Sequence, residues 1–383
     1  MKITGDWLTR SETQAVCQAL TSGGHQALFV GGCVRNSLMG AVISDIDIST
    51  DAPPARVTAL ATGAGLRVVP TGFDHGTVTV VSGGVPFEVT TFRRDVETDG
   101  RRAVVAFSTR ISDDAARRDF TMNALYATPD GTVIDPLGGL PDLLAHRLRF
   151  VGDASARIRE DYLRILRFFR FHAWYGDPDQ GLDAEGLAAC AGLADGIDGL
   201  SRERVGAEIR KLLAAPDPAP SVAAMARAGI LTRVLPGADD CALPPLVHLE
   251  DGMEPDWRRR LAALGGADPT DTLRLSRAEG QYLHQLRQAL ASADSPATLG
   301  YRHGPDRATD AVLIRAAMLG NTLPDDWRMD VNRGATAIFP IKSTDLPAFK
   351  GRALGARLAE LEQAWIASGF ALTRAQMLTE VDK

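Results

Sequence analysis

The sequence predicts an α+β protein, with strands gathered near the amino terminus and helices through the remainder. Two observations support this class. Up to about residue 140, short apolar runs rich in Val, Ile and Phe alternate with Gly-rich turns, which is typical of strands. Beyond that point, apolar residues recur at helical spacing and Pro or Gly breaks separate short helical groups. A chain of 383 residues is long enough for several domains.

The amino-terminal part begins with a predicted helix over Ser11–Leu20. Strand-like segments follow at residues 27–30, 45–48, 67–69, 77–81, 87–91, 124–127 and 132–134. Residues 93–118 are charged and turn-rich, and we expect a mobile loop there.

The remainder is predicted to be helical. One amphipathic helix is indicated by apolar residues at helical spacing, namely Ile158, Tyr162, Ile165, Phe169 and Ala173. Another helix is expected over Arg204–Leu213, before a proline-rich stretch at 216–220. We therefore expect a head at residues 1–140, a helical neck at 141–215 and a helical body and tail at 216–383.

The composition is that of an ordinary globular protein, with 45% hydrophobic and 23% charged residues. A formal net charge of −6 does not indicate nucleic-acid binding, so such a role must rest on local basic patches. The four scattered cysteines form no CxxC pair, which predicts reduced thiols in a cytoplasmic protein without a zinc site. No apolar run approaches the ~20 residues of a membrane span, so we expect no membrane contact.

The most informative segment, residues 28–50, places a Gly-Gly turn after an apolar strand and an aspartate pair further on. In a strand, Asp45 and Asp47 would share one face and repel each other unless a cation lay between them. Hard carboxylate oxygens suit Mg²⁺. Gly31 and Gly32 allow backbone N–H groups to approach a phosphate, and Arg35 adds a guanidinium. The alternative is a turn with solvated carboxylates; the combination favours nucleotidyl transfer.

A second candidate segment reads RRDFTMNAL at residues 117–125. Asp119 and Asn123 are four residues apart, so they share a face if the turn is helical. A carboxylate and an amide so placed can hold ribose hydroxyls, while Arg118 can contact phosphates. The alternative is an ordinary helix start with solvated charges.

A third candidate segment spans residues 157–174. Its polar residues recur every three positions and predict one stripe on the helix: Asp161, Arg164, Arg167 and Arg170. Such a stripe is commonly a solvated, salt-bridged face. However, a carboxylate beside a guanidinium matches the donor and acceptor edge of cytosine and of adenine. Uracil and guanine would leave polar groups unpaired, at ~1–3 kcal/mol each, so Asp161 and Arg164 could select C and A without a template.

These segments resemble the bacterial class II tRNA nucleotidyltransferases, or CCA-adding enzymes, and their poly(A) polymerase relatives in the polymerase beta nucleotidyltransferase superfamily. The resemblance covers residues 25–212. It runs in order through motifs at residues 31–47, 117–125, 135–143, 160–171 and 201–213. It implies a head with a mixed sheet, followed by an all-α neck, body and tail.

The resemblance also implies a role for each matching residue. In the head, it implies that Asp45 and Asp47 bind Mg²⁺, that Gly32 and Arg35 contact the triphosphate, and that Arg118 and Asp119 contact phosphate and ribose. In the neck, it implies that Asp161 and Arg164 read the base and that Arg167 and Arg170 line the same pocket. Glu88 resembles a third carboxylate that activates the primer 3′-hydroxyl. The implied partners are tRNA, CTP and ATP, not DNA, with tRNA bound through its phosphates by the helical carboxyl-terminal part.

The family usually has Asp where this chain has Asn36, and the amide loses a charge while keeping hydrogen-bonding capacity. Tyr162 follows Glu160-Asp161, whereas poly(A) polymerase relatives tend to carry proline there, so the CCA-adding activity is favoured. A poly(A) polymerase and an enzyme that adds only CC or only A stay open. The intact Asp99–Arg102 loop argues against the CC-only enzyme. A non-catalytic RNA-binding protein is disfavoured by the intact Asp45 and Asp47.

Overall fold

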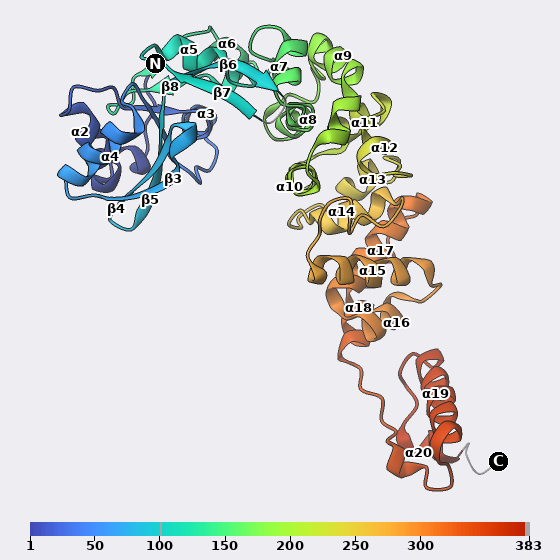
Figure 1. Cartoon of the computed structure of the whole chain (residues 1–383). Helices are drawn as coiled ribbons and strands as arrows, with labels where there is room; N and C mark the ends of the chain where they lie inside the picture. The colour runs from blue at the N-terminus through green and yellow to red at the C-terminus, as the bar shows by residue number, and fades with distance from the viewer. Residues whose placement is uncertain (100–101, 380–383) are drawn as a thin grey trace. The chain divides into compact units, whose positions relative to one another are not determined.

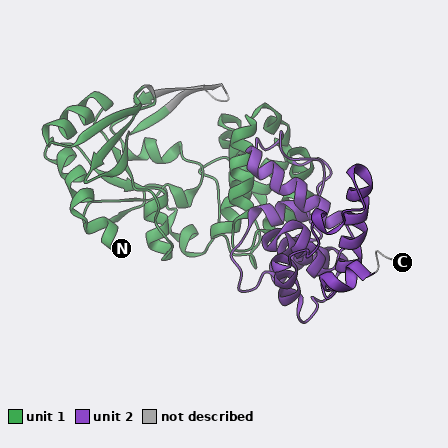
Figure 2. Ribbon diagram, turned by 90° about the horizontal axis from the view of Figure 1, so that it is seen from below, with its two compact units in different colours: residues 1–234 green, residues 235–383 purple. Residues whose placement is uncertain are grey.

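The computed structural model describes residues 1–99 and 102–379. The backbone forms two compact units, residues 1–234 and residues 235–383 (Figure 2). The strands that the structure describes all lie in the first unit, and the described part of the second unit is helical. The α+β class predicted from the sequence is therefore confirmed.

A mixed sheet and a separate two-stranded sheet make up the β-structure of the first unit. The strands are β1 (Leu28–Val30), β2 (Asp47–Thr50), β3 (Arg67–Gly72), β4 (Thr77–Ser82), β5 (Val85–Thr91), β6 (Arg93–Asp99), β7 (Arg102–Phe107), β8 (Tyr126–Ala127) and β9 (Val133–Ile134). The main sheet has seven strands in the order β3-β4-β5-β2-β1-β8-β9. Among the described strands, β2 and β5 are the one parallel pair, and β6 pairs with β7 in the separate sheet.

Helices precede, cover and follow this sheet in the first unit. They are α1 (Asp6–Thr9), α2 (Ser11–Thr21), α3 (Gly32–Met39), α4 (Pro54–Gly63), η1 (Phe73–His75), α5 (Ile111–Ala116), η2 (Thr121–Asn123), α6 (Leu140–Leu144), α7 (Ala154–Glu160), α8 (Leu163–Tyr175), α9 (Ala184–Gly192), η3 (Ala194–Gly199), α10 (Arg202–Leu213), α11 (Ala219–Arg227) and α12 (Ile230–Val234). Helices α2 and α4 pack against β4 and β5 (Figure 1).

The pairing of the central strands brings the sequence motifs to one edge of the sheet. Phe29 of β1 lies opposite Ile48 of the antiparallel β2, so the end of β1 and the start of β2 meet at that edge. Val30 also pairs with Tyr126 of β8. The turn after β1, the start of β2 and the segment that precedes β8 therefore converge.

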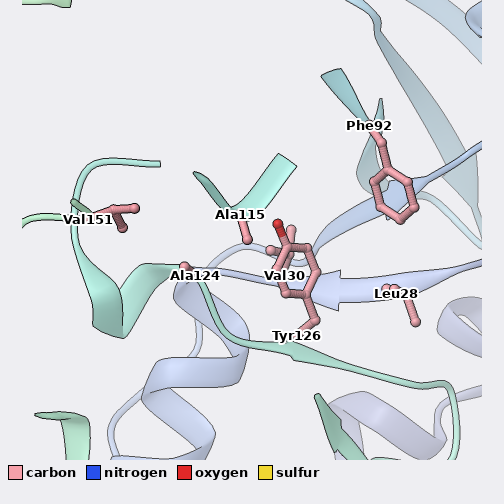
Figure 3. Close-up of a cluster of buried hydrophobic side chains, with 7 residues drawn as sticks. All are labelled: Leu28, Val30, Phe92, Ala115, Ala124, Tyr126 and Val151. Carbon is pink, nitrogen blue, oxygen red and sulfur yellow. The ribbon is translucent and has the colours of Figure 1, made fainter. Parts of the chain in front are cut away.

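A hydrophobic cluster underlies this edge. Its buried members come from several elements and are Leu28, Val30, Phe92, Ala115, Ala124, Tyr126 and Val151 (Figure 3). Removing apolar side chains of this size from water stabilises a fold by about 1.5–3 kcal/mol for each large residue. The cluster therefore fixes the backbone segments that carry the polar residues described below.

The predicted strands each overlap one strand of the main sheet, and the helix predicted over Ser11–Leu20 corresponds to α2. One strand boundary is wrong. Asp45 was expected within a strand, but β2 begins at Asp47, where pairing with Glu88 of β5 starts. Asp45 lies in the irregular segment before the strand and is exposed.

The prediction of a loop over residues 93–118 is also wrong for most of that range. The structure has β6, β7 and α5 there. The run Ala103–Phe107 has the β-branched and aromatic composition of a strand, and β6 with β7 form a hairpin whose charged sequence hid this propensity. Residues 100 and 101, within the Asp99–Arg102 loop, lie outside the described part of the chain.

The continuous helix expected over residues 158–173 is interrupted. Helix α7 ends at Glu160 and α8 starts at Leu163. Asp161 is extended, with φ −155° and ψ 104°, and its Oδ1 accepts the Leu163 N–H at 3.1 Å. Asp residues favour such caps over helix interiors, so Asp161 leaves the predicted stripe, while Arg164, Arg167 and Arg170 remain on α8.

The second unit is built from helices around its own core. These are α13 (Leu243–Leu249), α14 (Trp257–Leu264), α15 (Arg277–Ala291), α16 (Pro296–His303), α17 (Pro305–Leu319), α18 (Trp327–Thr336), η4 (Ser343–Asp345), α19 (Gly351–Ala367) and α20 (Arg374–Thr379). Trp365 and Met377 belong to a buried cluster at its carboxyl-terminal end. Across residues 1–99 and 102–379, none of the helices combines the length and apolarity needed to cross a membrane.

A buried ion cluster, defined as Glu250, Arg259, Arg260 and Asp310, lies within this unit. Each of the four residues is at most 5% exposed. Arg259 pairs with Glu250 at 2.8 Å and with Asp310 at 2.7 Å, and Arg260 pairs with the other oxygen of Glu250 at 2.8 Å. Tyr282 also donates to Asp310 at 2.6 Å. Acids and bases are thus equal in number in this cluster.

Candidate active site

A polar cleft of about 320 Å³ opens at the sheet edge where the motifs converge. Its lining comes from the turn after β1, α3, the segment before β2, the region of η2, and α8. The lining residues are Gly31, Gly32, Arg35, Asn36, Ser44, Asp45, Asp47, Arg118, Asp119, Asn123, Arg167, Phe171 and Tyr175. Most of the site residues predicted from the sequence therefore share one cleft.

The glycine turn shapes the floor of the cleft. Gly31 has φ 68° and ψ −119°, a conformation that L side chains rarely adopt, and it caps the amino terminus of α3. A side chain at Gly31 would also approach the Arg118 guanidinium, at 3.5 Å. The turn thus leaves the first backbone N–H groups of α3 facing the cleft, where they favour an anion.

Arg35 is the central cation of the cleft and is only 6% exposed. Its guanidinium donates to the Asn36 amide oxygen at 2.9 and 3.1 Å and to the Tyr175 hydroxyl at 2.9 Å, and it also bonds Asn123. It stacks 4.0 Å from the Tyr175 ring centroid. All these partners are neutral, and burial lowers the pKa of Arg35. A buried guanidinium without a carboxylate partner favours binding of an anion.

Asp119 and Asn123 form a hydrogen-bonded chain with two arginines. Asn123 accepts from Arg35 and donates to Asp119 Oδ1 at 2.9 Å. Arg167 Nε donates to Asp119 Oδ2 at 2.8 Å. Burial alone would raise the pKa of Asp119, but the Arg167 charge and these hydrogen bonds lower it to about 2. The two side chains meet as expected, but not on a helical face, because η2 begins at Thr121 and Phe120 is extended.

Arg118 is held by a different set of groups. It donates to Asp114 at 2.9 Å and to the Tyr126 hydroxyl at 3.0 Å, and Tyr126 in turn donates to Asp114 at 2.7 Å. Asp114 is fully buried and also bonds Arg117. Arg118 is therefore charge-paired with Asp114, while it also lines the cleft.

Acidic groups gather beside these cations. Asp47 and Glu88 are register partners on the parallel strands β2 and β5, and Asp45 precedes Asp47 in the chain. Burial, and next the charge of Glu88, raise the pKa of Asp47 to about 6, while Arg118 opposes this shift and Asp45 adds to it. A partly buried carboxylate with acidic neighbours is stabilised by a cation, and its oxygens are ligands that hard divalent cations prefer.

Four predicted residues lie outside the lining of this cleft. Asp161 lines a second pocket, of about 340 Å³, with its carboxylate 2.6 Å from Arg204 Nη2. Arg164 bonds Glu160 and donates to the backbone oxygens of Arg157, at 2.8 Å, and Arg117, at 2.9 Å. The side chains of Asp161 and Arg164 therefore bond other groups, although the Arg164 backbone N–H donates to the Asp161 backbone oxygen at 2.9 Å.

Arg170 also has another partner, because its Nε bonds Glu208 of α10. Glu88 does not belong to the lining of the main cleft, although its carboxylate affects Asp47.

Sequence reasoning missed Ser44, Phe171 and Tyr175, and it noted Asn36 only as a departure. Phe171 and Tyr175 follow Arg167 at four-residue steps on α8, so they share its face. Helical spacing from Arg167 was the signal that could have found them. They resembled core aromatics, and only the structure places them against the Arg35 guanidinium, at 5.1 and 4.0 Å.

A mixed sheet with an acidic pair at the start of one strand, and a glycine turn plus cations opposite, defines a nucleotidyltransferase-type site. Comparison with known proteins agrees with this class. Residues 27–149 match the family model described as "Poly A polymerase head domain", and residues 181–241 match "Probable RNA and SrmB- binding site of polymerase A".

Two curated relatives cover most of the chain. Mitochondrial CCA tRNA nucleotidyltransferase 1 of Mus musculus is 32% identical over 94% of this chain and 87% of its own length. The CCA-adding enzyme of Geobacillus thermodenitrificans is 33% identical over 88% of this chain and 85% of its own length. A crystal structure of the Bacillus stearothermophilus CCA-adding enzyme with CTP is 27% identical, with a TM-score of 0.73, covering 95% of this chain and 94% of its own.

The chain therefore belongs to the CCA tRNA nucleotidyltransferase family, and it is an enzyme of the nucleotidyltransferase class. The resemblance inferred from the sequence motifs is confirmed at the level of the family and the fold.

Proposed function

We propose that this protein adds C, C and A to the 3′ end of tRNA, using CTP and ATP and releasing pyrophosphate. The observation that carries this proposal is the charge arrangement of the cleft. Arg35 is buried with neutral partners only, while Asp47 is destabilised by burial and by acidic neighbours. A polyanion on one side and a divalent cation on the other satisfy both groups, and a metal-bound nucleoside triphosphate supplies both.

The carboxylates fit a divalent metal, as nucleotidyl transfer requires, and we assign that role to Mg²⁺ held by Asp45 and Asp47. The raised pKa of Asp47 supports this assignment, since a bound cation would relieve the same repulsion. When bound, the metal neutralises charge on the reacting phosphate oxygens. Glu88, which is exposed beside Asp47, is proposed to accept the proton of the primer 3′-hydroxyl.

The remaining cleft residues are proposed to bind the incoming nucleotide. Backbone N–H groups after Gly31 and Gly32, together with Arg35, would hold the triphosphate. Arg118 would contact a phosphate oxygen. Asp119 and Asn123 would contact the ribose and keep Arg35 and Arg167 in place through the hydrogen bonds already described. The work of the protein would then be positioning and charge stabilisation.

Base selection is proposed for Asp161 and Arg164, with Arg167 and Arg170 on the same helix supporting the nucleotide pocket. The carboxylate would accept from the amino group of cytosine or adenine, and the guanidinium would donate to the ring nitrogen. Asp161 pairs with Arg204, and Arg164 with Glu160. To read the base, Asp161 and Arg164 would therefore have to release these partners or bond to the partner and the base together.

The division of labour along the chain is likewise a proposal. Residues 1–140 would form the catalytic head, 141–215 the neck that reads the base, and 216–383 the body and tail that bind tRNA. Binding through phosphates would make tRNA affinity fall with salt. We propose a cytoplasmic location, in contrast to the relatives named as mitochondrial.

An extension assay tests the activity directly. The substrate is tRNA lacking its last three nucleotides, supplied with Mg²⁺ and each nucleoside triphosphate singly and in pairs. A product that stops at +3 with CTP plus ATP, and no product with UTP or GTP, is expected.

The family model named for poly(A) polymerase keeps a second activity in view. Unlimited growth with ATP alone would establish that activity instead. Arrest at +2 would indicate a CC-adding enzyme. Addition of A to a tRNA that already ends in CC, without any addition of C, would indicate an A-adding enzyme. Absence of extension would indicate an RNA-binding protein.

A further inference from the structure

The side chain of Asn36 bonds two parts of the cleft at once. It lies on α3 and lines the cleft directly after Arg35. Its Oδ1 accepts from Arg35 Nε at 3.1 Å and from Arg35 Nη2 at 2.9 Å. Its Nδ2 donates to the backbone oxygen of Val42 at 2.6 Å. One amide thus joins the buried guanidinium to the segment that follows α3.

That segment carries the acidic side of the cleft. Residues 41–46 connect α3 to β2 without regular secondary structure, and they include Asp45. The Asn36 backbone oxygen accepts the Ala41 N–H at 2.8 Å, which ends α3 at the left-handed Gly40. The Asn36 side chain then reaches one residue further. Two hydrogen bonds of Asn36, one from its backbone and one from its side chain, therefore fix the start of the segment that leads to Asp45.

Only a side chain with both a donor and an acceptor can make this pair of contacts. A carboxylate at position 36 could accept from Arg35, but it has no N–H to give to Val42 and would repel that carbonyl oxygen. An alanine would make neither contact. The Asn36 amide therefore does more than replace a charged Asp by a neutral group, because it also supplies the hydrogen-bond donor to Val42.

We propose that Asn36 is a positioning residue that couples the phosphate-binding Arg35 to the metal-binding Asp45 through the segment of residues 41–46. The proposal rests on the proposed function for the roles of Arg35 and Asp45. Its structural part, the coupling itself, does not depend on which nucleotide is added.

Two substitutions at Asn36 separate the two contacts, and a third is a matched control. Asn36→Asp keeps the acceptor for Arg35 and loses the donor to Val42. Asn36→Ala loses both. Ser37→Ala removes a hydrogen bond of the same helix that points elsewhere, because Ser37 accepts from Trp7 Nε1 at 3.1 Å.

Hydrogen exchange and metal-free binding of CTP measure the two contacts without any need for turnover. Backbone amides of residues 41–46 should exchange faster in both Asn36 variants and not in Ser37→Ala. Binding of CTP in EDTA should weaken about fivefold in Asn36→Ala, the size expected for one hydrogen bond. It should weaken at least as much in Asn36→Asp, because the new carboxylate would pair with the Arg35 guanidinium that attracts the triphosphate. The metal concentration that half-saturates tRNA extension should rise about fivefold in both Asn36 variants.

Other outcomes would overturn the coupling. Unchanged exchange of residues 41–46 in Asn36→Asp would show that the contact with Val42 does not hold this segment. A lower metal requirement in Asn36→Asp would show that position 36 joins the metal site directly. If wild-type protein fails to extend tRNA, the proposed function fails, while the exchange and CTP measurements still decide whether Asn36 couples Arg35 to this segment.

Discussion

Two regions of this molecule bury charged side chains, and they treat those charges differently. In the buried ion cluster of the second unit, two arginines face two carboxylates, all at most 5% exposed. In the cleft of the first unit, Arg35 is about as buried, but its hydrogen-bond partners among the described residues are neutral, and Asp47 lies among acidic neighbours. The protein thus completes one set of ion pairs and leaves the other incomplete.

This difference separates a structural from a functional arrangement of charge. Burying an uncompensated charge costs free energy unless another group neutralises it. The ion cluster supplies its own counter-charges, so it needs no ligand. The cleft contains the Arg167–Asp119 ion pair, but Arg35 there has neutral hydrogen-bond partners and Asp47 lies beside other acids, so ligands of opposite sign would stabilise both groups. The comparison predicts that substitutions in the two regions will affect different measurements.

The largest expected effect is on catalysis. Asp47→Asn should lower the rate of nucleotide addition about 10⁴-fold, equivalent to about 5.5 kcal/mol of activation free energy, because a charge proposed to bind the metal is lost. The free energy of unfolding should stay equal or rise, since the repulsion from Glu88 and the burial of a charge are relieved. Single-turnover extension and urea unfolding measure the two effects. A stability loss as large as the activity loss would contradict the comparison.

The ion cluster should respond in the opposite manner. Glu250→Ala leaves Arg259 and Arg260 without a shared acid and should cost about 3–5 kcal/mol of unfolding free energy in the second unit. The chemical step on a saturating primer should change little. Glu360→Ala, at an exposed pair with Arg357, is the control and should cost about 0–1 kcal/mol. Equal losses in both variants would remove the distinction between buried and surface pairs.

The fold was largely predictable from the sequence because its strands carry strong local signals. Apolar runs bounded by turns located all seven strands of the main sheet. The errors occur where local and tertiary preferences compete. The charged sequence of β6 masked a hairpin. Asp161 interrupts a helix whose apolar spacing is otherwise unbroken, and its carboxylate accepts the N–H of Leu163, the first residue of α8.

The candidate site was predictable where a motif is short and continuous. Gly31, Arg35 and Asp47 meet because β1 and β2 are neighbours in the sheet. The aromatic residues under Arg35 were not predictable, since Phe171 and Tyr175 look like core residues until a distant guanidinium is placed on them. The partners of Asp161 and Arg164 were also not predictable from the sequence. In the structure, Arg204 bonds the Asp161 carboxylate and Glu160 bonds the Arg164 guanidinium.

A smaller effect is expected at Arg35 itself. Arg35→Gln should weaken CTP binding about 10- to 100-fold, the size of a charge-assisted hydrogen bond, because the triphosphate loses its buried cation. Unfolding free energy should change far less than in Glu250→Ala, since no buried acid is left unpaired. Calorimetric titration with CTP and urea unfolding check both statements. Unchanged CTP affinity would show that Arg35 is structural, like Arg259.

The smallest expected effect is on the pH dependence of stability in acid. Burial alone would raise the pKa of Asp114, but the charges of Arg118 and Arg117 and the Tyr126 hydrogen bond lower it to about 2. A carboxyl whose pKa is lower in the folded than in the unfolded chain stabilises the fold fully above its ordinary pKa, and this contribution disappears as the pH falls toward 2. For Asp310, burial outweighs Tyr282 and Arg259, and the pKa is raised. Its protonation therefore does not weaken the second unit in the same range.

Lowering the pH from 5 to 3 should therefore weaken α5, which carries Asp114, more than α17, which carries Asp310, with about 1 kcal/mol of the difference due to Asp114. Hydrogen exchange on α5, which carries Asp114, and on α17, which carries Asp310, reports the two units separately. Asp114→Asn should reduce the pH sensitivity of α5 by that amount and leave α17 unchanged. Equal acid sensitivity of α5 in wild type and variant would mean that the pairs around Arg118 add no net stability. Arg118 would then resemble Arg35, a cation held in place for a ligand and not for the fold.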